Sequence, residues 1–85
     1  MENRVAVIAI IVRDGEAVGP LNELLHQYGR YIIGRMGVPY RERGVNIISV
    51  AMDAPQNTIS AMAGKIGSLP GVSVKTAYSS IVSQE

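Results

Sequence analysis

The sequence contains no cysteine, phenylalanine or tryptophan, and it has a single histidine among its 85 residues. Without cysteine the chain forms no disulfide and no thiolate metal site. The single histidine, His26, makes any histidine-built transition-metal site dependent on ligands from several chains. Tyrosine is the only large aromatic residue type, so we expect an aliphatic core in which methionine fills the gaps.

Strong charge of one sign and long apolar runs are also absent. Eight basic and seven acidic residues give a net charge of +1, which is too balanced for a general polyanion binder. No apolar run approaches the roughly 18 residues that cross a bilayer. The amino-terminal MENRVAVIAIIV has an acid before its apolar stretch and no small-residue cleavage site after it, which indicates a strand rather than a signal peptide. We therefore expect a soluble cytoplasmic protein that does not contact a membrane.

Four segments are expected to form strands. Residues 4–13 and 45–53 are apolar on both faces, which is typical of central strands. Residues 30–38 carry two glycines and two arginines and are followed by Pro39, so they favour an edge position. Residues 72–77 alternate polar and apolar side chains and also suit an edge.

Two segments show helical periodicity. Over 17–28 the apolar residues form a stripe, with Pro20 in the first turn and Gly29 at the carboxyl end. The regular helix is expected to begin near Val18 or Gly19, because proline is tolerated only in the first turn.

The second helix is expected to open at residues 53–55, with Pro55 in its first turn, and to end at Gly67. The element order is then βαββαβ, a compact α+β motif of the ferredoxin-like type. In that fold the antiparallel strand order is 4-1-3-2, which places the two apolar strands in the centre. We predict a single domain over residues 1–85, with a core over 4–78 and a polar tail over 79–85 that frays.

Both helices of such a fold cover the same face of the sheet. The other face would carry about six aliphatic side chains from the central strands, whose burial is worth on the order of 10 kcal/mol. A bare apolar face of this size favours a homo-oligomer, a dimer or a tetramer, packed through sheets or sheet edges. The alternative is that the carboxyl-terminal tail folds over the face.

The segment GRMGVPYRERG, residues 34–44, has two interpretations. In the first it is an anion site, where Arg35, Arg41 and Arg43 hold a carboxylate or phosphate beside glycine amides. In the second it is a β-hairpin with a polar tip over residues 39–44. We favour the hairpin, because the glycines lack the spacing of a phosphate loop.

Gly34 and Gly37 lie inside the expected edge strand, where glycine marks a bulge or the close approach of a neighbouring chain. The same region mixes basic residues with tyrosines, Tyr40 among them, which is a pattern of nucleic-acid surfaces. The small net charge argues against DNA binding by this chain on its own. Catalysis has little support, because no serine motif surrounds the single histidine and the carboxylates form no evident pair.

Four stretches carry a family resemblance: RVAVIAIIV, LNELLHQYGRYIIGRMGVPYRERGVNIISV, DAP and ISAMAGKIGSLPGVSVK. Together they cover about residues 3 to 78, and YGRYIIGRMGVPYRERG is the most specific part. In these stretches the sequence resembles the iron-only hydrogenase system regulators, small bacterial proteins of the ACT-like class. The resemblance implies a ferredoxin-like fold and oligomers like those of the carboxyl-terminal domain of the nickel-responsive regulator.

The chain departs from the nickel regulator in two ways. The first strand begins at Arg4, so we expect no DNA-binding ribbon-helix-helix segment before it. The cysteine and the set of histidines of the nickel site are missing as well, so the resemblance does not extend to nickel sensing. We expect no metal at His26, because its partners would have to come from symmetry-related chains.

ACT domains use a glycine in the loop after strand one to line an amino-acid effector pocket at a subunit interface. Asp14-Gly15 matches that position loosely, although we favour an ordinary turn. We predict a non-enzymatic, oligomeric regulator that binds a small effector or a partner protein at an interface; the sequence names neither the effector nor a cofactor. The alternative is a transcriptional regulator that contacts DNA through a symmetric arginine cluster. The candidate site residues are Asp14, Gly15, Gly34, Arg35, Gly37, Tyr40, Arg41 and Arg43.

Overall fold

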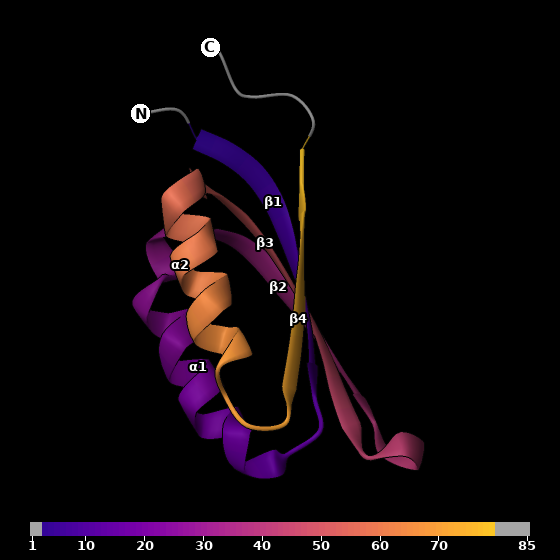
Figure 1. The fold of residues 1–85 in the computed structure, drawn as a ribbon. Coiled ribbons are helices and arrows are strands. Elements are labelled where there is room, and N and C mark those ends of the chain that lie inside the picture. Colours follow the sequence, from indigo (N-terminus) through magenta and orange to yellow (C-terminus); the bar gives the residue numbers. More distant parts are fainter. Residues whose placement is uncertain (1–2, 80–85) are drawn as a thin grey trace.

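The structure, a computed structural model, describes residues 3–79. These residues form one four-stranded sheet and two α-helices (Figure 1). The elements are β1 (Asn3–Val12), α1 (Val18–Gln27), β2 (Ile32–Tyr40), β3 (Val45–Pro55), α2 (Gln56–Gly67) and β4 (Val72–Tyr78). Short 3-10 turns occupy Gly15–Ala17, Gly29–Tyr31 and Arg41–Arg43.

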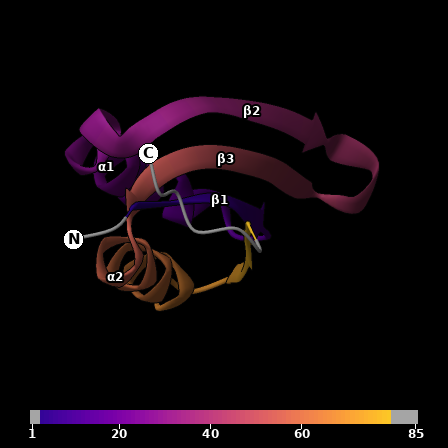
Figure 2. The ribbon, with the colours of Figure 1, turned by 90° about the horizontal axis from the view of Figure 1, so that it is seen from above.

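The strands are all antiparallel and lie in the order β2-β3-β1-β4. This confirms the predicted order 4-1-3-2, which is the same arrangement counted from the other edge. Both helices lie on one side of the sheet, and within residues 3–79 no element lies on the other side (Figure 1, Figure 2). The two faces of the central strands therefore have different surroundings although both are apolar.

The hydrophobic core fills the space between the helices and the sheet. Alternate residues of β1 and β3 are buried there, because successive side chains of a strand point to opposite faces. The helical periodicity predicted for the second helix is confirmed, since Ile59, Met62 and Ile66 are buried and Ala63 packs half-buried against the core. The buried core residues are Ala6, Ile8, Ile10 and Val12 of β1, Val50, Met52 and Ala54 of β3, and Ala17, Leu21, Leu25, Ile59, Met62 and Ile66 of the helical segments.

The second strand differs from its expected range of 30–38, because it begins and ends two residues later. Residues 29–31 form a tight turn instead, in which the Tyr31 N–H donates to the Tyr28 carbonyl at 2.9 Å. Both tyrosines pack against the core and hold the turn in place. Pro39 does not end the strand, because an edge strand has one unpaired side where a missing N–H removes no ladder hydrogen bond.

The other boundaries differ less. The helix α1 begins at Val18 with Pro20 in its first turn, as predicted. Strand β3 runs to Pro55, so this proline precedes α2 as its N-cap residue and does not stand inside its first turn. Residues 80–85, which include most of the expected tail and could supply the alternative cover for the sheet, lie outside the described residues.

Strands β2 and β3 form the hairpin that the sequence favoured. Its turn closes at Gly44, which has a left-handed backbone with φ of 64°. A register shift between Ile32 and Gly34 places a bulge beside Gly34. A bulge was one of the two features predicted for the glycines of this strand. The last residue of β1 pairs with Asn46, so the hairpin continues past the end of β1 (Figure 2).

The loop after β1 is held against the turn that precedes β4. The Arg13 N–H donates to the Gly71 carbonyl at 2.7 Å. Gly71 has φ of 74°, and a Cβ on it would lie 2.6 Å from the Cβ of Asp14. The close approach of these two segments therefore requires glycine at position 71.

We expect Gly71→Ala to lower the free energy of unfolding by about 1–3 kcal/mol, because alanine is strained at this φ and would contact Asp14. The control is Gly64→Ala in α2, where a Cβ meets nothing within 4 Å. That substitution should stabilise the protein by about 0.5–1 kcal/mol through helix propensity. Urea unfolding followed by circular dichroism measures both changes, and equal effects of the two substitutions would contradict the expectation.

Candidate functional site

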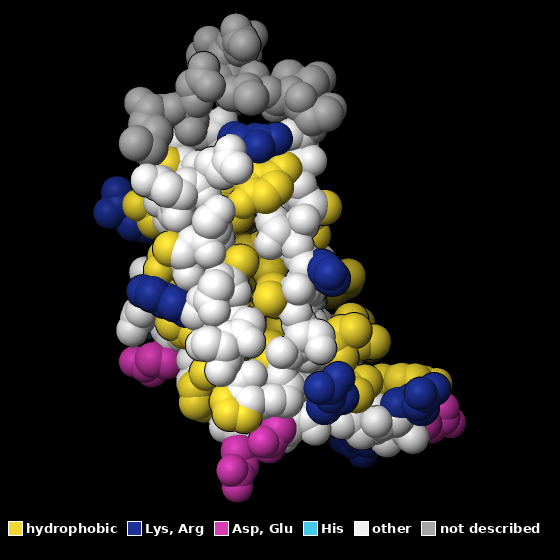
Figure 3. Space-filling view, viewed as in Figure 1, with side chains coloured by type: hydrophobic (Ala, Val, Ile, Leu, Met, Phe, Trp, Pro, Cys, Tyr) yellow, Lys and Arg dark blue, Asp and Glu magenta, His cyan; other side chains and the backbone are white. Residues whose placement is uncertain are grey.

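The side of the sheet away from the helices is apolar, and no element of residues 3–79 covers it. We call it the open face. Eight large hydrophobic residues are exposed within residues 3–79. Seven of them lie on the open face by strand register, and the eighth, Ile33, lies at the bulge of β2. Figure 3 shows hydrophobic side chains along the right-hand side of the molecule, where the sheet faces away from the helices. The seven residues of the open face are Val5, Val7, Ile11, Met36, Val38, Tyr40 and Ile47.

Two charged side chains of the strands belong to the open face, and they differ in sign. Asp53 pairs with Val5 at one end of the face, and Lys75 pairs with Ala9 on the edge strand β4. Gly34 is also on this face, opposite Ala51. The centre of the face is thus uncharged, and its rim carries one charge of each sign.

The hairpin tip is basic. Arg41 and Arg43 are exposed in the turn after β2, with Glu42 between them. The Tyr40 hydroxyl donates to the Glu42 carboxylate at 3.1 Å, which fixes the acidic side chain beside the tyrosine. Figure 3 shows Lys or Arg side chains and an acidic one gathered at the projecting end of the molecule.

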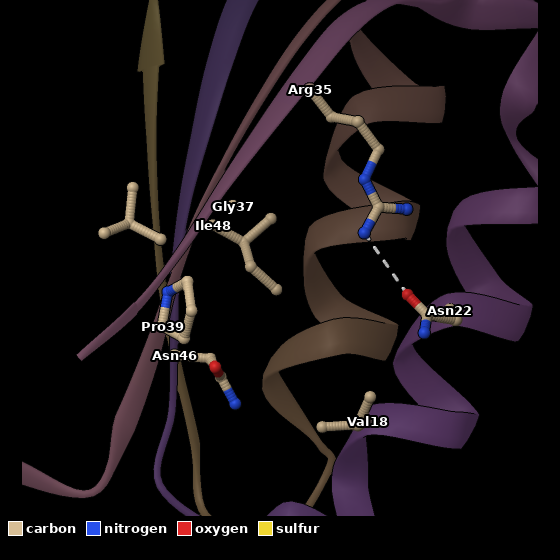
Figure 4. Close-up of a pocket in the computed structure, with 8 residues that line it drawn as sticks. Val18, Asn22, Arg35, Gly37, Pro39, Asn46 and Ile48 are labelled. Carbon is tan, nitrogen blue, oxygen red and sulfur yellow. Dashed lines mark hydrogen bonds between the residues drawn. The ribbon is translucent and has the colours of Figure 1, made fainter. Parts of the chain in front are cut away.

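A groove of about 270 Å³ lies on the helix side, between α1 and the β2–β3 hairpin (Figure 4). The Arg35 side chain crosses its upper end and donates from Nη2 to Oδ1 of Asn22 at 3.3 Å. Pro39, Asn46 and Ile48 border the other side. The complete lining is Val18 and Asn22 of α1, Arg35, Gly37, Val38 and Pro39 of β2, and Asn46 and Ile48 of β3.

The groove exists because the helix layer does not cover β2. After the half-buried Ile32, every residue of β2 is exposed, on the helix side as well as on the open face. On the helix side, Arg35 pairs with Val50 and Gly37 pairs with Ile48. Because Gly37 has no side chain, the space beside Ile48 on this side of the sheet stays open. A Cβ on Gly37 would meet no atom within 4 Å.

The anion site suggested by three arginines is not assembled within one chain. Arg35 lines the groove on the helix side of the sheet, whereas Arg41 and Arg43 lie in the tip. The structure brings together Arg35 and Gly37 from the predicted residues. It separates them from Gly34 and Tyr40, which belong to the open face.

The loop after β1 has the geometry of an ordinary capped turn. Asp14 Oδ1 accepts from the Glu16 N–H at 3.0 Å and caps the short turn Gly15–Ala17. A small cavity of about 150 Å³ lies between this loop and the turn before β4, and Asp14 and Pro20 are among its lining residues. Its acidic lining comes from Asp14 and Glu16.

His26 is exposed near the end of α1 and borders a shallow hollow beside the groove, with which it shares Asn22 and Arg35. Within residues 3–79 no group of three or more histidine, cysteine, aspartate or glutamate side chains is placed to hold a metal ion.

The sequence interpretation missed Asn22 and Asn46 of the groove. Asn22 stands four residues after Val18, so helical spacing puts both on one face of α1. Asn46 lies opposite Pro39, and this pairing can be derived from the sequence only once the register of the hairpin is known. A turn over residues 41–44 fixes that register, and this was the signal that could have found the residue.

Comparison with known proteins identifies relatives of the whole fold. Residues 4–76 match the family described as "TM1266-like: Iron-only hydrogenase system regulator, putative". The uncharacterized protein TM1266 from Thermotoga maritima has a similar structure, with 37% sequence identity and a TM-score of 0.87, over 91% of this chain and 98% of that chain. No curated protein matches the sequence.

Two more distant structures share the fold. A formyltetrahydrofolate deformylase from Pseudomonas putida KT2440 is 11% identical with a TM-score of 0.62, over 86% of this chain and 28% of that chain. An unknown protein from Galdieria sulphuraria is 17% identical with a TM-score of 0.63, over 96% of this chain and 48% of that chain. At these identities the similarity establishes the ferredoxin-like fold and nothing about activity.

Neither α1 nor α2, the helices of the described residues, is long and apolar enough to cross a membrane.

The capped turn gives a prediction for Asp14. We expect Asp14→Ala to lower the free energy of unfolding by about 0.5–2 kcal/mol, because the Glu16 N–H loses its acceptor. Asp14→Asn should stay close to the wild type, since an amide oxygen accepts the same hydrogen bond. Glu16→Ala is the control, because its exposed carboxylate is not the cap. If urea unfolding shows the same loss of unfolding free energy for the alanine and asparagine variants, the stabilisation comes from the carboxylate charge and not from the hydrogen bond to the Glu16 N–H.

Proposed function

Because the chain belongs to the TM1266-like family, whose description names an iron-only hydrogenase system regulator, we propose that it is a non-enzymatic regulatory module that works as a homo-oligomer. Copies pair through the open face of the sheet. A small effector or a partner protein then acts by favouring one arrangement of the subunits over another.

The open face is the observation that carries this proposal. Its seven large hydrophobic residues are between 41% and 64% exposed. Burying the exposed half of such a side chain contributes about 1 kcal/mol, so two copies together gain on the order of 10 kcal/mol. Association costs about 4–15 kcal/mol, so the apolar surface is large enough to offset most or all of that cost.

The shape and charge of the face also favour a second copy as the occupant. The uncharged centre is self-complementary, and the rim carries Asp53 and Lys75 with opposite signs, so two copies do not repel each other. Gly34 lies on this face with nothing within 4 Å of a Cβ built on it, which leaves room for a neighbouring chain.

We expect Ile47→Glu to weaken self-association at least about tenfold, because a carboxylate in an apolar interface is buried without a partner. Ile47 lies on the open face between Ile11 of β1 and Val38 of β2. The matched control is Gln27→Glu, which adds the same charge on the exposed side of α1. Size-exclusion chromatography with light scattering, run at two protein concentrations, measures the change.

Three results of that measurement would count against the proposal. The wild type could remain a monomer at micromolar concentration. The Ile47→Glu variant could keep the wild-type mass. The control could dissociate to the same extent, which would assign the loss to charge and not to the open face.

A second candidate function is direct DNA contact by a transcriptional regulator. The observation in its favour is the hairpin tip, which carries Arg41 and Arg43 away from the rest of the sheet. A twofold oligomer would present two such tips. Against it, Arg35 does not join the tip, and Glu42 neutralises part of its charge.

We expect no binding of the wild-type protein to random-sequence duplex DNA at low salt, because each copy offers only two arginines at the tip. Fluorescence anisotropy of a labelled duplex provides the measurement. Binding that weakens steeply with added salt, and that disappears when Arg41 and Arg43 are both changed to glutamine, would establish direct DNA contact instead.

A further inference from the structure

We infer that the groove between α1 and the β2–β3 hairpin binds a small carboxylic acid that has a short apolar tail and no amino group. The site lies within one chain, on the helix side of the sheet, and is separate from the open face. The inference names an effector class for the regulator proposed above and rests on that function for its biological role. Binding itself does not require a second copy.

The polar end of the groove is built to hold an anion. Arg35 reaches from β2 to Asn22 on α1, and its exposed guanidinium donates one hydrogen bond of 3.3 Å from Nη2 to the Asn22 Oδ1 (Figure 4). A guanidinium has five N–H donors, so most of them stay free for a bidentate contact with a carboxylate. Asn22 accepts from Arg35 through Oδ1, which leaves its amide N–H groups as further donors at the same end.

No described residue that lines the groove is acidic, so the charge of Arg35 is not neutralised there. The half-buried Asn46 amide makes no side-chain hydrogen bond within residues 3–79 and faces the groove from the other side (Figure 4). It supplies a second polar contact for the ligand, such as a keto or hydroxyl oxygen.

The remaining walls are apolar. Val18, Pro39 and Ile48 surround the space below Arg35, and Gly37 adds no side chain to it (Figure 4). A volume of about 270 Å³ is at the small end of the range for ligand sites, which fits a molecule of several carbon atoms. These walls favour a hydrocarbon tail over a second charged group.

The same lining excludes the other common anions. An amino acid brings an ammonium group, which finds no carboxylate in the lining and is repelled by the Arg35 guanidinium. Inorganic phosphate gains nothing from the apolar walls and has only one arginine to neutralise it. The expected ligand is therefore a keto acid or a short branched-chain acid.

The test is an NMR titration of the ¹⁵N-labelled full-length protein with 4-methylpentanoate. We expect saturable shifts centred on Asn22, Gly37 and Asn46, with a Kd of about 1 mM or lower. Leucine, which has the same carbon skeleton with an added amino group, and inorganic phosphate should bind at least about tenfold more weakly. N-acetyl-leucine represents the carboxyl end of a peptide, and tighter binding of that compound would overturn a free acid as the ligand.

Three variants locate the site. Arg35→Gln should weaken binding at least about tenfold, because the charged hydrogen bonds are lost, whereas Arg43→Gln at the tip should not change it. Gly37→Val should abolish binding, because its side chain occupies the open space of the groove. The strand should keep its fold, since nothing lies within 4 Å of the new Cβ and valine suits a strand.

The outcomes separate this inference from the proposed oligomer. Carboxylate binding that survives Ile47→Glu, together with self-association that survives Gly37→Val, supports two independent features. Absence of saturable shifts up to about 10 mM, or shifts that are unchanged in both Arg35→Gln and folded Gly37→Val, overturns the carboxylate site whatever the oligomeric state. A monomeric wild type that still binds the acid removes the oligomer and leaves the site.

Discussion

A sheet has two faces, and the two helices of this chain can cover only one of them. The central strands are apolar on both faces, so the side chains that point toward the helices become the core, and those that point away remain exposed. The division follows the strict alternation of side chains along β1 and β3. The side on which a residue falls decides whether it joins the core and the groove or the open face.

The helix layer is also narrower than the sheet. Strand β2 lies beyond its edge and is exposed on both sides, and that one mismatch produces two different surfaces. On the open face, β2 adds Met36, Val38 and Tyr40 to an apolar surface. On the helix side, the uncovered strip between α1 and β2 becomes the groove that Arg35 crosses. Neighbouring residues of one strand thus serve two surfaces, with Val38 named in both the open face and the lining of the groove.

The fold was accessible from the sequence because each signal was local. Strands apolar on both faces pointed to the centre of the sheet, a strand with two glycines pointed to an edge, and the resulting order proved correct. The boundaries of β2 were missed because tyrosines 28 and 31 hold the preceding turn through contacts with the core, and such contacts are invisible in a linear pattern. The groove was missed for a similar reason. It needs Asn22 and Asn46, which are distant in sequence, to face Arg35 across the gap beside α1.

The outer edge of β2 carries two interruptions. The backbone bulges near Ile33, and Pro39 has no N–H to offer. A further strand added along this margin would meet a broken ladder, whereas β4, the other edge strand, pairs with β1 without a register shift. This margin is thereby protected from adding a strand of another copy, and so from the edge-to-edge growth that leads to fibrils.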